Sequence, residues 1–389
     1  MTAPIGYRAH GLHAGIKPKE PDLAMLVSDV PAVAAAVFTK NRLVGAHVSI
    51  CRERIQGRKA QAVVVNSGNA NACTGEQGLA DAREMASVAA NVLGINEGLV
   101  YPCSTGSIGM ALPMDAIRGG IRELASRVSS EGGQAAAKGI LTTDTVHKEV
   151  AVELSVSGQT IRIGAMAKGA GMIEPDMATM LAFLTTDAEI TADALQSCLT
   201  DAVNESFNRI SVDGDQSCND TVLFLANGRA GNSALELTSQ DWDAFSQAVQ
   251  DVTTELANMI VADGEGATKF VTVRVSGAVT SGDADLAARA IANSLLVKTA
   301  MYGENAQALW GRAITAVGYS GIVCDLSRCD VYLNETPVVL GGISTGAEEQ
   351  LRDIVSSPRY TLDLKLHEGE GHGTIFTCDC SEAYVKLNM

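Results

Sequence analysis

Alternating apolar and polar residues predict a β-hairpin near the middle of the chain. Val152, Leu154 and Val156 alternate with polar positions, and the alternation resumes at residue 161 after a Ser157–Gln159 turn. A period of two residues is typical of a strand with one buried face. We therefore expect two antiparallel strands that lead directly into the segment beginning at residue 168.

The segment after this hairpin carries two glycines and Pro175, so we expect no helix over residues 168–176. An apolar, strand-like run follows at residues 177–184, with the hydroxyl of Thr179 near its start. A threonine in an apolar strand usually has a structural role. The alternative is that Thr179 attacks the carbonyl of Ala178. Hydrolysis of the resulting ester would make Thr179 a new amino terminus, and its own α-amine would serve as its base.

The rest of the pattern alternates strand-like and helix-like segments, which predicts a mixed α/β fold. Expected strands lie at residues 23–27, 34–38, 62–65, 221–226 and 270–275, and expected helices at 82–93, 113–128, 191–207 and 239–260. Further alternating elements are expected at residues 283–294, 311–317, 330–333, 345–356, 360–366, 374–377 and 383–387. Residues 1–4 are expected to be loose.

Charge and composition exclude several classes of function. The formal net charge of −16, from 45 acidic and 29 basic residues, opposes binding to nucleic acids or anionic membranes. No signal-peptide pattern and no apolar run of about 18 residues is present. The nine dispersed cysteines indicate reduced thiols of a cytoplasmic protein. Neither the Cys378/Cys380 pair nor the acidic residues 213–220 have the spacing of a metal site, so no metal or cofactor is expected.

Four polar stretches are candidates for chemistry, and each has a structural alternative. The asparagine-rich residues 66–71 could form a tight turn or contact a substrate. Thr105 and Gly106 could stabilise an oxyanion or cap the following helix. Asp144 and its neighbouring threonines could form only a turn. Glu265, between two glycines at a helix end, is placed against the helix dipole, which favours a functional role.

Seven motifs, taken together and in order, resemble the ornithine acetyltransferase family of bifunctional arginine-biosynthesis proteins. They are VNSGNANACTGEQG (65–78), CSTGSIG (103–109), LTTDT (141–145), KGAGMIEPDMATML (168–181), NRISVDGD (208–215), DGEGATK (263–269) and AVGYSG (316–321). The resemblance extends over nearly the whole chain. It implies a self-cleaving, N-terminal-nucleophile-like αββα sandwich, cut between Ala178 and Thr179 into subunits of residues 1–178 and 179–389 that assemble as a heterotetramer.

The resemblance also implies the roles of individual residues. Thr179 would be the nucleophile, and Thr105 and Gly106 would form the oxyanion hole. Substrate would be bound by Thr142, Lys168, Thr179, Glu265 and Asn388, with Glu265 receiving the cationic amine of ornithine. The alternative for Lys168 is an exposed lysine at a strand end.

The implied reaction is ping-pong transfer of acetyl from N-acetylornithine to L-glutamate. Some family members also use acetyl-CoA as a donor, and the sequence leaves that open. Here the chain ends at Met389, without the terminal Thr or Ser that family members usually carry after the position of Asn388. The substrate carboxylate then has one contact fewer, or another group supplies it. The alternatives are an amidohydrolase or aminopeptidase of the same self-cleaving fold, and an uncleaved metabolite-binding protein.

Overall fold

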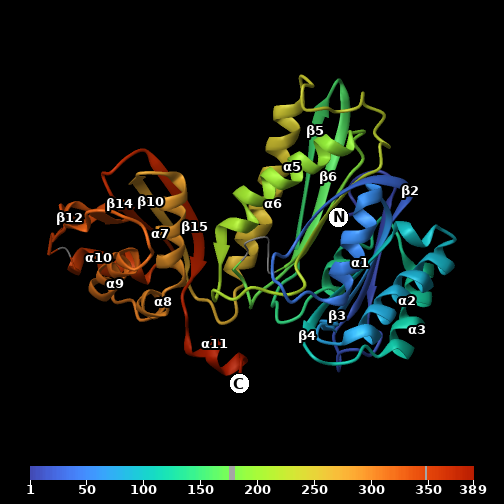
Figure 1. Ribbon diagram of the computed structural model, residues 1–389, viewed down its shortest axis with the longest axis horizontal. Coiled ribbons are helices and arrows are strands. Elements are labelled where there is room, and N and C mark those ends of the chain that lie inside the picture. Colours follow the sequence, from blue (N-terminus) through green and yellow to red (C-terminus); the bar gives the residue numbers. More distant parts are fainter. Residues whose placement is uncertain (175–179, 347) are drawn as a thin grey trace. The chain divides into compact units, whose positions relative to one another are not determined.

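The computed structural model describes residues 1–174, 180–346 and 348–389. The chain divides into two compact units (Figure 1), each with its own sheet. The first unit comprises Met1–Gly169, Pro175–Asn208 and Asp215–Ile260, and the second comprises Ala170–Glu174, Arg209–Gly214 and Val261–Met389. The chain therefore enters the second unit for five residues, 170–174, directly after the hairpin.

The first unit is built on an eight-stranded sheet in the order β4-β3-β2-β9-β7-β6-β5, with β1 added beside β2. The strands are β1 (Tyr7–Leu12), β2 (Leu23–Phe38), β3 (Lys59–Asn69), β4 (Val100–Ser107), β5 (Lys148–Val156), β6 (Gln159–Lys168), β7 (Leu181–Thr186) and β9 (Thr221–Ala226). β5, β6 and β7 are antiparallel neighbours, whereas β7 and β9 run parallel. The predicted hairpin is thus confirmed.

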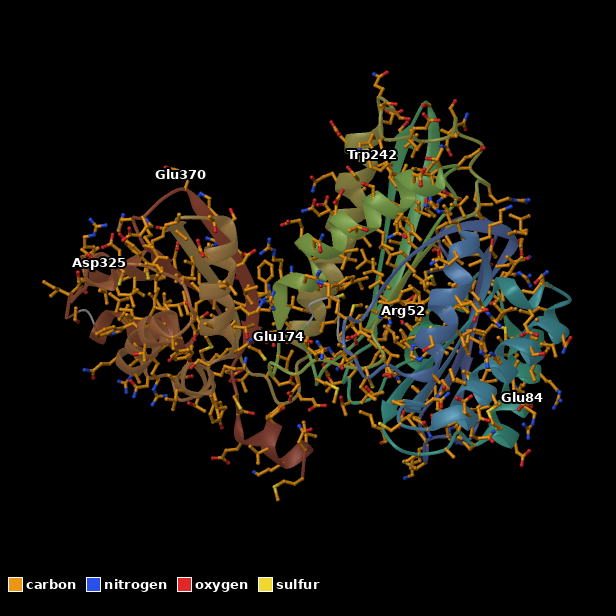
Figure 2. The ribbon with its side chains drawn as sticks, viewed as in Figure 1. Arg52, Glu84, Glu174, Trp242, Asp325 and Glu370 are labelled. Atoms are coloured by element: carbon orange, nitrogen blue, oxygen red, sulfur yellow. The ribbon has the colours of Figure 1, made fainter. Side chains whose placement is uncertain are left out.

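Helices bury both faces of this sheet. They are α1 (Ala46–Arg54), α2 (Gly75–Leu93), α3 (Met114–Arg127), α4 (Gly133–Gly139), α5 (Ala192–Glu205) and α6 (Trp242–Ala262), whose first residue is labelled in Figure 2. Met25 and Val64 pack in one core cluster with residues of α2 and α3, which lie side by side in Figure 1. Leu26 and Val63 belong to a second cluster with α4. Successive strand residues point to opposite faces, so these strands appear in the sequence as continuous apolar runs.

Two expectations about the first unit were wrong. The strands expected at residues 23–27 and 34–38 are one strand, β2, whose pairing with β3 shifts register between Val27 and Ala32. Pro31 lies in this irregular stretch, where its missing N–H leaves no gap in a regular ladder. The first residues are not loose either: Met1 is 4% exposed, and its carbonyl accepts a hydrogen bond from Thr185 Oγ1 at 2.6 Å.

The second unit is built on a seven-stranded sheet in the order β13-β12-β11-β14-β10-β15-β8. Its strands are β8 (Ile210–Ser211), β10 (Phe270–Ala278), β11 (Asp330–Leu333), β12 (Thr336–Leu340), β13 (Ile343–Ser344), β14 (Arg359–Lys365) and β15 (Gly371–Cys378), and its helices are α7 (Ser281–Asn293), α8 (Leu295–Tyr302), α9 (Ala306–Gly318), α10 (Glu348–Ser356) and α11 (Glu382–Leu387). Buried residues alternate along β14, which indicates one covered face. The expected mixed α/β fold with two sheets is confirmed.

Two general properties follow from the described residues. None of their helices has the length and apolar character needed to cross a membrane. All nine cysteines are free thiols.

Candidate active site

The expected oxyanion hole lies at the end of β4. Thr105 is 8% exposed and pairs with Ser67 of β3, while Gly106 pairs with Gly68. Gly106 has a φ of 133°, and a Cβ there would lie 2.3 Å from the Gly68 carbonyl carbon and 2.4 Å from the Asn69 nitrogen. Only glycine fits so close an approach. The two residues lie within a strand, because β4 continues to Ser107.

The asparagine-rich stretch braces this strand end. Asn66 Nδ2 donates to the Asn69 carbonyl at 2.8 Å, and Asn66 Oδ1 accepts from Ser104 Oγ at 2.6 Å. Asn69 Nδ2 donates to the carbonyls of Met110 and Ala111 at 3.2 and 3.0 Å. These buried side chains hold backbone groups around Thr105 in place. Of the two interpretations left open, the structural one accounts for these contacts.

A buried ion cluster surrounds the segment that holds Thr142. The Asp144 carboxylate accepts from Lys148 Nζ at 2.7 Å, and neither side chain is exposed. It also accepts from the backbone amides of Thr142 at 3.1 Å and Gly169 at 2.7 Å. Burial alone would raise the pKa of Asp144, but the charges of Lys168 and Lys148 and these hydrogen bonds lower it to about 2. Asp144 therefore ties Thr142 to the residue that follows Lys168.

Lys168 ends β6 and pairs with Leu181, the first residue of β7. It is 7% exposed, so the alternative of an exposed strand-end lysine was wrong. Its charge acts on Asp144 and on Asp220, which is 3% exposed and directly precedes β9. Burial raises the pKa of Asp220 well above its ordinary value, although Lys168 and hydrogen bonds partly oppose the shift.

The sequence analysis did not single out Lys17 or Lys148 in this region, and it considered Asp220 only as a metal ligand. Lys17 Nζ donates to the carbonyl of Leu141 at 3.0 Å, beside Thr142. Lys148 had one usable signal, because a lysine at the start of an apolar strand four residues after an aspartate is a candidate buried ion pair. Lys17 had none, since a single lysine among glycines and prolines is ordinary on a surface.

The second unit holds the other two substrate-binding candidates. Glu265 is 9% exposed and follows the end of α6. Asn388 Nδ2 donates to Glu265 Oε2 at 2.7 Å, and the Glu265 amide donates to the Ala170 carbonyl at 2.8 Å. A Cβ on Gly171 would lie 2.4 Å from the Glu265 carboxyl carbon, so this glycine leaves space for the carboxylate. The structure thus brings Glu265 and Asn388 into direct contact.

The short segment 170–174 is fastened within the second unit. The Asp213 carboxylate accepts from the amides of Met172 and Ile173 at 2.6 and 2.8 Å. Glu174, labelled in Figure 2, lies 3.4 Å from Arg289 Nη1 and accepts from Asn293 Nδ2 at 2.5 Å. Asp213 thus holds the backbone of this segment in place. Among the described residues, no group of His, Cys, Asp and Glu could hold a metal ion.

The expected cleavage site, Ala178 and Thr179, lies outside the described residues. Description resumes at Met180, whose carbonyl accepts from the Thr221 amide at 3.1 Å. Gly169 to Glu174, the described part of the preceding segment, contain no helix, as expected.

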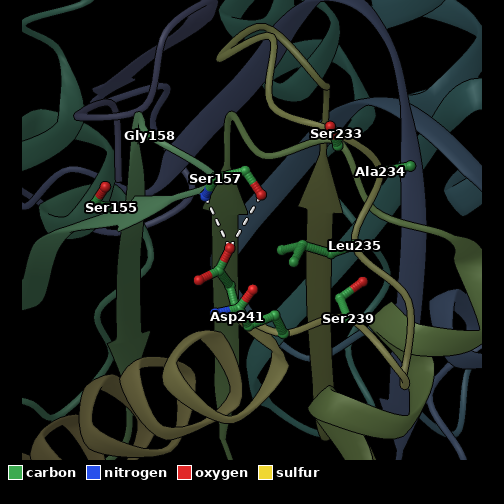
Figure 3. Close-up of a pocket in the computed structure, with 9 residues that line it drawn as sticks. Ser155, Ser157, Gly158, Ser233, Ala234, Leu235, Ser239 and Asp241 are labelled. Atoms are coloured by element: carbon green, nitrogen blue, oxygen red, sulfur yellow. Dashed lines mark hydrogen bonds between the residues drawn. The ribbon is translucent and has the colours of Figure 1, made fainter.

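One surface pocket is formed by the β5–β6 turn and the residues before α6 (Figure 3), and it contains none of the candidate site residues. Its volume is about 390 Å³. The carboxylate in it, Asp241, already accepts from Ser157 N at 2.8 Å and Ser157 Oγ at 3.1 Å. We therefore assign no chemistry to this pocket.

Comparisons with known proteins agree with the motifs. A family model described as the ArgJ family matches residues 8–389. The "Arginine biosynthesis bifunctional protein ArgJ" of Symbiobacterium thermophilum is 48% identical, with 100% of this chain and 97% of the relative aligned. The protein of the same description from Geobacter sulfurreducens is 45% identical, with 98% of both chains aligned.

A solved structure gives a partial match. The crystal structure of Arginine biosynthesis bifunctional protein argJ from Bacillus halodurans is 46% identical, covers 46% of this chain and 93% of its own, and has a TM-score of 0.44. The assignment depends on the sequence comparisons, which span the chain almost from end to end. This chain belongs to the ArgJ family, and it is an acyltransferase of arginine biosynthesis.

Proposed function

We propose that this chain transfers the acetyl group of N-acetylornithine to L-glutamate through an acetyl ester on Thr179. The proposal depends on one observation in a chain of this family. Buried Thr105 is followed by Gly106, and Gly106 lies so close to Gly68 that no side chain fits there. Preorganised donors of this kind stabilise the charge that develops during acyl transfer, at about 3–4 kcal/mol for each donor.

In the first half-reaction, Thr179 Oγ attacks the acetyl carbonyl carbon, and the α-amine of Thr179 takes the hydroxyl proton. The hydroxyl of Thr105 and the N–H of Gly106 donate to the oxyanion. Collapse breaks the bond between carbonyl carbon and nitrogen, and the α-amine returns the proton to the leaving amine of ornithine. Acetyl-Thr179 remains.

In the second half-reaction, the α-amine of glutamate attacks the ester carbonyl. The bond from the carbonyl carbon to Thr179 Oγ breaks, and the proton of the attacking amine passes through the α-amine of Thr179 to Oγ. We assign Thr142 and Lys168 to the α-carboxylate that both substrates share, and Glu265 to the side-chain ammonium of ornithine. Asn388 holds Glu265 through the 2.7 Å hydrogen bond.

The free α-amine requires self-cleavage. Thr179 Oγ attacks the Ala178 carbonyl, the peptide becomes an ester, and water hydrolyses it to an Ala178 carboxylate and a Thr179 amine. Subunits 1–178 and 179–389 would remain together, because β7 and β9 of the second lie between β2 and β6 of the first in one sheet. The heterotetramer and the cytoplasmic location belong to the same proposal and are supported by family membership.

The test is intact-mass measurement of the purified chain and of Thr179→Ala, together with acetyl-transfer assays. We expect two fragments divided at 178/179 and an acetyl adduct on the second fragment after incubation with N-acetylornithine alone. Thr179→Ala should stay a single chain and transfer nothing. Thr179→Ser is the matched control, because it retains the hydroxyl and should still cleave.

An active, uncleaved chain would overturn the proposal. Acetyl release to water at the same rate with or without glutamate would instead indicate a hydrolase of the aminopeptidase type. Adding glutamate should convert the acetyl group quantitatively into N-acetylglutamate.

A further inference from the structure

Lys17 is fixed beside the substrate-binding segment of the first unit. The buried Asp22 carboxylate accepts from the backbone amides of Ala14, Ile16 and Lys17 at 2.6, 2.7 and 2.9 Å. The Lys17 stem lies against Gly68, since a Cβ on that glycine would be 2.7 Å from Lys17 Cγ. Lys17 therefore reaches from Gly68, the strand partner of Gly106, to the carbonyl of Leu141, the residue before Thr142.

The Lys17 ammonium has capacity for a ligand. The structure gives Nζ one acceptor among the described residues, the Leu141 carbonyl at 3.0 Å, and an ammonium has three N–H donors. The side chain is half-buried. Burial lowers the pKa of Lys17, and the nearby charge of Lys168 lowers it further, while Asp22, Glu20 and Asp144 act in the opposite direction. A bound anion would stabilise the charged form.

Apart from Asp220, the buried and half-buried charged groups of the described surroundings are three lysines and two carboxylates, Asp144 and Asp22; Glu20 also acts on Lys17, but it is exposed, so solvent screens its charge. Lys17, Lys148 and Lys168 all act on Asp144, whose carboxylate is already bonded to Lys148 and to two backbone amides. Asp22 is occupied by backbone amides, as above. Burial favours the neutral form of Asp220. A half-buried region with more cations than anions attracts a negatively charged ligand.

The two amino-acid substrates of the proposed function differ at one end. Both have an α-carboxylate, but the ornithine side chain ends in an ammonium and that of glutamate in a second carboxylate. Glu265 suits the first and repels the second. We infer that Lys17 binds the side-chain carboxylate of the glutamate acceptor and thereby selects the substrate of the second half-reaction. This inference depends on the proposed function.

The test compares Lys17→Met with Lys19→Met in the full chain. Lys19 is an exposed lysine two residues away and serves as the matched control. We expect Lys17→Met to raise the KM for glutamate about tenfold or more, because a hydrogen bond to a charged group is lost. The KM for N-acetylornithine and the yield of acetyl-enzyme should stay within about twofold of the unaltered chain. Lys17→Arg should retain most of the glutamate affinity.

A second measurement is the preference of the enzyme for glutamate over glutamine as acceptor. This preference is a ratio, so it does not depend on the fraction of protein that is folded. The ratio of kcat/KM for glutamate to that for glutamine should fall about tenfold in Lys17→Met and not in Lys19→Met. An unchanged ratio, or an equal rise in KM for both substrates, would overturn the role of Lys17. Absence of acetyl-enzyme in the unaltered chain would instead refute the proposed function, so the two failures are distinguishable.

Discussion

Two buried carboxylates, one in each unit, have different partners. In the first unit, Asp144 is saturated: Lys148 pairs with it at 2.7 Å, and the amides of Thr142 and Gly169 donate to it. In the second, Glu265 accepts from the neutral amide of Asn388 at 2.7 Å, and no cation pairs with it among the described residues. A carboxylate whose charge is already balanced holds backbone in place, whereas one without a counter-ion can attract a cationic ligand.

This difference predicts that one carboxylate contributes to the stability of the fold and the other to the affinity for substrate. Charge removal at Asp144 should chiefly affect folding, and charge removal at Glu265 should chiefly affect binding of the ornithine ammonium. The glycines beside the two sites offer a parallel contrast. Gly106 faces backbone, which cannot yield, whereas Gly171 faces the end of a side chain, which can move.

The largest expected effect is that of Gly106→Ala. Its new Cβ would meet the Gly68 and Asn69 backbone, so β3 and β4 must separate and the oxyanion donor must move. We expect kcat to fall about 10²–10³-fold. Gly171→Ala should mainly raise the KM for N-acetylornithine, because the Glu265 carboxylate must turn aside. Gly119→Ala in α3, where a Cβ meets nothing within 4 Å, is the control in both assays. Equal losses of kcat in the first two variants would contradict the contrast.

Next in size is the loss of stability in Asp144→Asn. Lys148 is 0% exposed and would lose its ion pair with Asp144 while its charge stays buried, which costs about 3 kcal/mol. Urea denaturation measures the change. Asp115→Asn removes a carboxylate that is fully exposed and should change the free energy of unfolding by less than about 0.5 kcal/mol. Adding Lys148→Met to Asp144→Asn should recover part of the loss.

The sequence predicted best those elements whose pattern is local. β9 and β11 begin and end at the expected residues, 221–226 and 330–333, because apolar runs bounded by polar residues define them. The break expected inside β2 was wrong, since a long strand with a register shift is set by its neighbours in the sheet. The packing of Met1 has the same origin, as the acceptor role of its carbonyl depends on Thr185.

The candidate site was predictable in its motifs but not in its electrostatics. The motifs singled out Thr105, Gly106 and Glu265 as candidates, because glycines lie within or beside each motif. The pairing of Asp144 with Lys148 joins a loop to a strand, and Lys17 approaches Leu141 across more than a hundred positions. The four-residue spacing of Asp144 and Lys148 is a signal for the first contact, whereas no period or spacing encodes the second.

A smaller effect is the acid sensitivity caused by Asp144. Its pKa in the folded chain is lowered to about 2, below the ordinary value of 3.8. A depressed pKa contributes stability above about pH 4 that is lost as pH falls towards 2, about 2 kcal/mol in all. Thermal unfolding between about pH 5 and pH 2 should show this loss in the unaltered chain and a shallower slope in Asp144→Asn. Parallel slopes would mean that Asp144 is not the group responsible.

The smallest effects are expected at Glu265, and they test whether this carboxylate, unlike Asp144, contributes to substrate binding and not to stability. Glu265→Gln keeps an oxygen that accepts from Asn388, so the free energy of unfolding should change by less than about 0.5 kcal/mol. The ammonium of ornithine loses its counter-ion, and the KM for N-acetylornithine should rise about tenfold, equivalent to about 1.4 kcal/mol. Asn388→Ala removes the 2.7 Å hydrogen bond that orients the carboxylate and a 3.0 Å hydrogen bond to the Tyr384 carbonyl, while the charge of Glu265 remains, so the KM for N-acetylornithine should rise by about twofold to fivefold. If Glu265→Gln destabilised the chain as much as Asp144→Asn, Glu265 would be a structural carboxylate like Asp144. A stability loss confined to Asp144→Asn and a KM change confined to Glu265→Gln would separate the two carboxylates by function.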